Sequence, residues 1–98
     1  MPDRDDPLLY RFGLEWEPAS KLAEDCARAV ANGYLHGISA FSRTARIDAV
    51  AASRTEVERH FRVVQTGRNP YHHTIAVPQP ITDDVADILN RLFGRQRP

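Results

Sequence analysis

The residues of this sequence that could do chemistry near neutral pH gather in two short segments. Residues 36–39 read HGIS and residues 71–74 read YHHT, so histidines lie near hydroxyl side chains in both. A neutral imidazole accepts a proton and its charged form donates one, which suits general acid–base catalysis. If His36 and His73 met in one cleft, with Tyr71 orienting the substrate and an arginine binding phosphate, they could cleave RNA without a metal. His36, His73 and Tyr71 are therefore the catalytic candidates of a small, toxin-like ribonuclease.

Other chemistries fit these segments less well. A two-histidine phosphoesterase needs two His-x-Ser/Thr motifs, and His72 with Thr74 supplies one of them while His36 supplies none. A metal site needs three or four converging ligands, whereas His72 and His73 are neighbours on a predicted strand and point to opposite faces. The sequence has no cysteine pair and no glycine-rich phosphate loop,. We predict neither a bound metal nor a cofactor.

Arginine dominates the basic residues, and six arginines fall between residues 42 and 68. Arg43, Arg46 and Arg68 are the candidates for binding an anion or a nucleic acid, because a guanidinium can bond a phosphate through two parallel N–H groups. The sequence holds 13 basic and 13 acidic residues, so it lacks the basic excess that phosphate binding usually brings,. A general preference for Arg and Ala in the coding sequence is the other explanation of the cluster.

The first element that must position these residues is a strand over residues 8–16. Tyr10, Phe12, Leu14 and Trp16 alternate with charged residues or glycine, which is the period of a half-buried strand,. We expect these four side chains to share one face, covered by a helix or by a partner.

Helix and strand signals alternate along the rest of the chain. We predict a helix over 19–31, a doubly covered strand over 35–42, a short helix over 54–61, an antiparallel hairpin of strands 62–66 and 71–77, and a final helix between Thr82 and Gly94,. The short helix begins at a capping box, Ser53–Glu56, and Thr82 caps the last helix. Residues 49–51 fit either a short strand or a loop.

The resulting order, β-α-β-α-β-β-α, predicts an α+β fold. We expect a four-stranded mixed sheet with parallel crossovers and with helices packed mainly on one face. A chain of 98 residues suffices for one domain,. We place it at residues 8–94, between an acidic, disordered tail at 1–7 and a frayed basic tail at 95–98.

The composition bears on where the protein works. Cys26 is the single cysteine, so no intramolecular disulfide can form and a reducing compartment fits,. No apolar run approaches the ~20 residues that cross a bilayer, and the acidic N-terminus is unlike a signal peptide. We expect a cytoplasmic protein that does not bind membranes.

Three functions follow from these features. The apolar first strand and the lack of a convincing active site favour a protein-interaction or regulatory module, which binds another protein or forms a homodimer through its sheet. The arginine-rich segment 43–68 favours a nucleic-acid-binding domain, and the element order is similar, at the level of fold alone, to small RNA-binding domains such as the C-terminal half of a bacterial initiation factor. The ribonuclease that uses His36 and His73 is the third.

Overall fold

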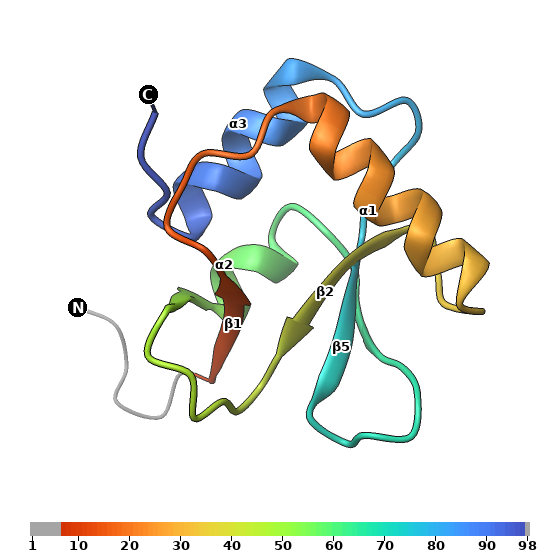
Figure 1. Cartoon of the computed structure of the whole chain (residues 1–98), viewed down its shortest axis with the longest axis vertical. Coiled ribbons are helices and arrows are strands. Elements are labelled where there is room, and N and C mark those ends of the chain that lie inside the picture. Colours follow the sequence, from red (N-terminus) through yellow and green to blue (C-terminus); the bar gives the residue numbers. More distant parts are fainter. Residues whose placement is uncertain (1–6, 98) are drawn as a thin grey trace.

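The chain folds as one antiparallel sheet with helices between its strands, in the strand order β3-β1-β2-β5-β4 (Figure 1). The computed structural model describes residues 7–97. Its elements are β1 (Leu8–Phe12), α1 (Ala19–Ala31), β2 (Gly37–Phe41), β3 (Ala49–Ser53), α2 (Arg54–Glu58), β4 (Val63–Gln65), β5 (His72–Ala76) and α3 (Asp83–Leu92). The predicted α+β class is confirmed.

Two details of the predicted sheet are wrong. The described residues form five strands rather than four, because the stretch around residues 49–51 pairs with β1 along its whole length as β3. Every pairing between the five strands is antiparallel, so the expected mixed sheet with parallel crossovers does not form. The predicted hairpin of β4 and β5 is confirmed, with Val64 opposite Thr74.

The connection between β1 and β2 explains the missing parallel crossover. After β1 the chain does not turn straight into a helix: Glu15 forms a parallel bridge with Gln96, and the Trp16 amide donates to the Gln96 carbonyl. Figure 1 shows this connector beside the C-terminal tail, beyond the end of the sheet. Helix α1 therefore starts outside the sheet and returns the chain to the end at which β1 finished, which makes β2 antiparallel to β1.

Strand β1 is shorter than predicted and faces the other way. Gly13 has a φ of +84°, a conformation that favours glycine, and the alternation ends there,. Leu9 is fully buried on the helix-covered side, while Tyr10 lies on the opposite side, paired with Phe41. Leu14, which follows the strand, is 63% exposed. The aromatic residues of β1 are thus left on the side of the sheet away from the core.

All three helices contribute to one hydrophobic core on a single face of the sheet. The buried side chains of that core are Leu9, Leu22, Cys26, Ile38, Ala40, Ala52, Val57, Phe61, Ile75, Val77, Ala86, Leu89 and Phe93. The predicted helix caps are confirmed: Ser53 accepts a hydrogen bond from the Glu56 amide, and Thr82 accepts one from the Val85 amide.

Burial raises the pKa of the Cys26 thiol to about 11, so it stays protonated and packs as a small apolar group,. No helix within residues 7–97 has the length and apolar character needed to cross a membrane.

Residues 95–97, which we expected to fray, are packed against the β1–α1 connector. The Arg95 side chain is 2% exposed and donates to the Glu17 carboxylate and to the Phe12 carbonyl. The Arg97 guanidinium lies 4.7 Å from the centre of the Trp16 ring. The predicted disordered tail at 1–7 falls outside the described residues except for Pro7.

A buried polar cluster fixes the start of α1. Glu17 accepts hydrogen bonds from both Arg11 and Arg95. Asn90 of α3 accepts from the Glu17 amide at 2.8 Å and donates to the Glu17 carbonyl at 2.7 Å, which satisfies both backbone groups of that residue,. Asp25 of α1 completes the cluster, 3.8 Å from the Arg11 guanidinium. This cluster joins β1, α1, α3 and the C-terminal tail.

Candidate functional site on the outer face of the sheet

The candidate site lies on the face of the sheet opposite the helical core, which we call the outer face. Because side chains alternate along a strand and paired residues share a face, the strand register assigns this face directly. Its central side chains are Tyr10, Phe12, Ser39, Phe41, His72 and Thr74. No helix of the described chain packs its apolar side against them, since the buried residues of all three helices belong to the core on the other face.

Four rings form a continuous row across the outer face, which we call the ring row. Phe12 of β1 lies 5.5 Å from Phe41 of β2, centroid to centroid, and Phe41 lies 5.3 Å from His72 of β5. Tyr34, from the loop that follows α1, lies 4.9 Å from His72. All four rings are partly exposed. The rings are tilted relative to their neighbours by 33°, 75° and 36°, so the row presents partly exposed ring faces and ring edges to a ligand.

The predicted anion-binding arginines gather at one end of this face. The Ser42 amide bonds the Tyr71 carbonyl, so the loop after β2 and the β4–β5 turn, which carries Arg68, leave the sheet at the same end. The Arg46 guanidinium lies 3.8 Å from the centre of the Phe12 ring, and Arg43 lies 5.7 Å from the Tyr71 ring. The segments that carry Arg43, Arg46 and Arg68 thus lie at one end of the sheet, and their role in binding an anion or a nucleic acid stays a prediction.

Charge is unevenly distributed between the two sides of the molecule. The loop and turn at this end, residues 42–48 and 66–71, hold three arginines and one aspartate, Asp48. That aspartate bonds the Arg46 Nε at 2.9 Å, and this bond lowers the pKa of its carboxyl. Helices α2 and α3, on the other side of the sheet, hold five acidic residues and two arginines. Arginines pair with three of these five acidic residues, Glu56, Glu58 and Asp87. The clear imbalance is therefore the excess of arginine at this end of the outer face.

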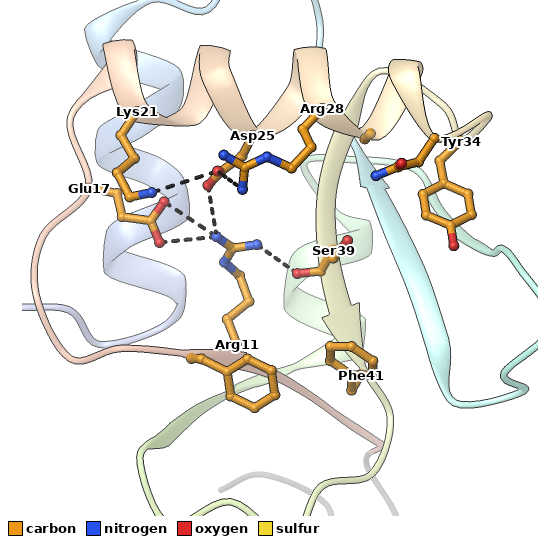
Figure 2. A pocket seen from close by; sticks show the side chains of 11 residues that line it. Arg11, Glu17, Lys21, Asp25, Arg28, Tyr34, Ser39 and Phe41 are labelled. Carbon is orange, nitrogen blue, oxygen red and sulfur yellow. Dashed lines mark hydrogen bonds and ion pairs between the residues drawn. The ribbon is translucent and has the colours of Figure 1, made fainter.

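A cleft of about 420 Å³ opens from the outer face into the gap between β1 and β2, beneath α1. These two strands share one paired position, Tyr10 with Phe41, and separate beyond it. Arg11 fills the gap, and its Nη1 donates to the Ser39 carbonyl at 2.6 Å. Figure 2 shows the Arg11 guanidinium between β2 and the charged side chains of α1, namely Lys21, Asp25 and Arg28.

Ser39, His72 and Thr66 form a hydrogen-bonded chain at the edge of this cleft. The Ser39 Oγ lies 3.0 Å from His72 Nε2, and the Thr66 carbonyl lies 3.1 Å from His72 Nδ1. In the tautomer with the hydrogen on Nδ1, the Thr66 carbonyl accepts that hydrogen and Nε2 presents its lone pair to the serine hydroxyl,. The Thr66 Oγ1 also lies 3.0 Å from Nδ1. This is the arrangement of a hydroxyl, a base and a group that orients the base.

The structure does not bring the predicted catalytic histidines together. The Val77 amide bonds the His36 carbonyl, whereas His73 lies opposite Ala40, four residues further along β2, or about 13 Å away,. His36 Nδ1 is bonded to the Val77 carbonyl at 2.8 Å. His73 is 5% exposed on the core side, with its Nδ1 3.1 Å from the Tyr71 carbonyl. Both histidines therefore have structural hydrogen bonds and face away from the cleft.

The residues that sequence reasoning did not select are Ser39 and His72. Strand alternation carries the signal that places them on the outer face, since each is flanked by residues of the core face,. Their contact depends on the register between β2 and β5, which pairs Ser39 with Thr74 and Phe41 with His72. No local pattern specifies that register.

Comparisons of the chain with protein-family models, with curated proteins and with solved structures found no match. Within residues 7–97, no three His, Cys, Asp or Glu side chains converge in a way that would hold a metal ion. The function is therefore inferred from the geometry of the chain itself.

Proposed function

We propose that this protein binds single-stranded nucleic acid on the outer face of its sheet. The observation that carries the proposal is the ring row, in which Phe12, Phe41, His72 and Tyr34 lie 4.9–5.5 Å apart across three strands. Unpaired bases stack on exposed aromatic side chains of a sheet regardless of their sequence, because every base has a flat π-face. The bases of a double helix are already stacked on one another, so they are not free to stack on these rings.

The charge distribution supports the same ligand. Arg43, Arg46 and Arg68 stand at one end of the outer face, where they can contact the phosphates of a strand whose bases lie on the ring row. Arg46 already lies over the Phe12 ring, 3.8 Å from its centre. A base that stacks on Phe12 displaces this guanidinium towards the backbone phosphate.

Replacement of Phe41 by Ala is expected to weaken binding of a fluorescently labelled oligouridylate by about 5–150-fold, because the stacking of one base contributes about 1–3 kcal/mol. Phe41→Leu keeps an apolar side chain but no flat ring, so it should also weaken binding. Fluorescence anisotropy measures the Kd, and circular dichroism checks that each variant is folded.

Trp16→Ala is the matched control for Phe41→Ala, because Trp16 is a partly exposed aromatic residue outside the ring row. It should bind the oligonucleotide as the wild type does. Wild-type affinity should fall as salt increases, and Arg43→Ala with Arg68→Ala should reduce that salt dependence. Binding that is insensitive to salt, or equal for wild type and Phe41→Ala, would contradict the proposal.

Self-association is a second candidate function, and the edge strand β3 favours it. Strand β3 has no charged residue along Ala49–Ser53, and nearby Ile47 is fully exposed. The backbone bonds that flank β3, Gly13 to Asp48 and Arg54 to Pro7, set its register. In that register Ala49 and Ala51 direct their N–H and C=O groups away from β1. An uncharged edge strand is a template for antiparallel pairing with a second copy.

Ala51→Pro should weaken such a dimer about 5–150-fold. The substitution removes an outward N–H from each of two symmetric strands, and each lost hydrogen bond costs roughly 0.5–1.5 kcal/mol. The β1–β3 ladder keeps its bonds, because the Ala51 amide does not donate to β1. Light scattering during size-exclusion chromatography measures the mass over a range of protein concentrations. Ala51→Val, which keeps the amide, should still dimerise, and a wild type that remains monomeric at every concentration would remove this candidate.

A further inference from the structure

We propose that Ser39 is a nucleophile activated by His72, and that the cleft beside it accepts small carboxylic esters. This activity goes beyond nucleic-acid binding and depends on different observations, namely the hydrogen bonds of His72 rather than the ring row as a stacking surface. The first of these is the 3.0 Å separation of Ser39 Oγ and His72 Nε2. A nucleophile within hydrogen-bond reach of a base that a third group orients is the general signature of covalent catalysis.

Main-chain and ring contacts hold the base in position. The Thr66 carbonyl lies 3.1 Å from Nδ1 and accepts its hydrogen in the tautomer that the reaction uses, which leaves the Nε2 lone pair for the serine proton. Phe41 meets the imidazole ring edge-on at 5.3 Å, and Tyr34 packs on it at 4.9 Å. Thr66 acts here as a positioning residue through its main chain. With its ring held in place, His72 needs no movement towards Ser39 to take the proton,.

The nucleophile is accessible and lies on a cavity of suitable size. Ser39 is an exposed residue of β2 and lines the 420 Å³ cleft, which is within the range of small-molecule sites. Phe12 and Phe41 give this cleft an apolar wall that fits a short acyl group. Lys21 and Arg28 of α1 line it as well, and both pair with Asp25. The charged lining consists of three cations, with Arg11 as the third, and two carboxylates, Glu17 and Asp25, so its net positive charge favours a carbonyl oxygen that becomes negative,.

The reaction balances with water as the only co-reactant. Ser39 Oγ attacks the ester carbonyl carbon while its proton moves to His72 Nε2. The carbon–oxygen bond to the alcohol then breaks, and the leaving oxygen takes that proton, which leaves an acyl group on Ser39. A water molecule gives its proton to His72 and attacks the acyl carbon. The carboxylic acid is released, and Ser39 regains its hydrogen.

Covalent labelling with a fluorophosphonate probe tests this proposal directly, because such probes react with activated serines and not with ordinary ones. Wild-type protein should form one adduct, which peptide mass spectrometry locates at Ser39. Ser39→Ala should give no adduct, and His72→Gln should label at least ~100-fold more slowly, which is the lower end of a general-base contribution. Hydrolysis of p-nitrophenyl acetate by the two variants should fall in parallel.

Ser42→Ala and His36→Ala are the matched controls, since both lie on or beside β2 but outside the Ser39–His72 pair, and both should label as the wild type does. Ser39 is exposed, so Ser39→Ala is expected to fold normally, and circular dichroism confirms this for each variant. An unlabelled wild type, an adduct on another serine, or full-rate labelling of His72→Gln would overturn the proposal. Labelling of Ser39 without oligonucleotide binding would support this inference and contradict the proposed function. Oligonucleotide binding without labelling would do the reverse.

Discussion

Glu17→Ala is expected to reduce the free energy of unfolding by about 3–5 kcal/mol, the cost of breaking a buried ion pair from one side. The Glu17 carboxylate lies between the guanidinium groups of Arg11 and Arg95, whose side chains are 9% and 2% exposed. Burial and the nearby positive charge of Arg11 lower the pKa of Arg95, whereas Glu17 opposes both effects. Without Glu17, two desolvated cations face each other with Asp25 as their remaining counterion nearby.

Urea unfolding followed by circular dichroism measures this loss. Glu58→Ala is the control, because Glu58 pairs with Arg54 at the surface, and exposed pairs contribute only about 0–1 kcal/mol,. The double variant Glu17→Ala with Arg95→Met should recover part of the stability, since it removes the unpaired cation as well. A loss below about 1 kcal/mol for Glu17→Ala would show that the cluster does not hold the connector in place.

Gly37→Ala is expected to destabilise the protein by about 3 kcal/mol, at the upper end of the usual range for overpacking. A Cβ at this position would lie 2.1 Å from the Ile75 carbonyl oxygen and 2.8 Å from the Thr74 Cγ2. The carbonyl belongs to the backbone of β5, the neighbouring strand, so it can move only if the β2–β5 pairing moves with it. The same displacement would separate Ser39 from His72, because these two residues lie on the strands that are forced apart.

Thermal and urea unfolding measure the effect of Gly37→Ala, and hydrogen exchange at the β5 amides locates it. Ser42→Ala, at the other end of β2, is expected to change stability by less than about 0.5 kcal/mol. Wild-type stability together with unchanged protection of β5 would contradict the close approach of the two strands at Gly37.

Elements that depend on local chemistry were predictable from the sequence. The hydroxyl caps Ser53 and Thr82 start their helices where expected, and the apolar stripe through Leu22 and Cys26 buries α1 as expected. The turn that contains Gly67 also depends on local chemistry, and it joins β4 and β5 as the predicted antiparallel hairpin. Each of these signals acts over a few residues, so a single sequence suffices to read it.

The face of β1 could not be predicted, because its determinants lie far apart in the chain. The period-two pattern suggested that a helix or a partner covers the aromatic residues of this strand, since the alternate position holds a charged residue, Arg11. That arginine is buried instead, because Glu17, Asp25 and the Ser39 carbonyl provide its partners. The aromatic side chains consequently turn outward and become the ring row.

The candidate site was predictable in part. The two histidine-containing segments lie on or beside strands of the proposed site, and the fold brings Arg43, Arg46 and the turn that carries Arg68 to one end of the sheet. Which histidine lies beside a hydroxyl depends on the pairing of Phe41 with His72, and this register follows from the whole sheet. Self-association remains a prediction, and we now expect it to occur through the edge strand β3.

The contact between Arg95 and Glu17 joins residues that are 78 positions apart. During synthesis on a ribosome, β1 and the β1–α1 connector are made before Asn90 and Arg95, the residues of the C-terminal part that hydrogen-bond Glu17. The nascent chain can form α1 and the β2 region early. Glu17, which pairs with Arg11, lacks its other partners, Asn90 and Arg95, until those residues have been synthesised. We expect the native arrangement of the first strand to form only after Asn90 and Arg95 have been synthesised,.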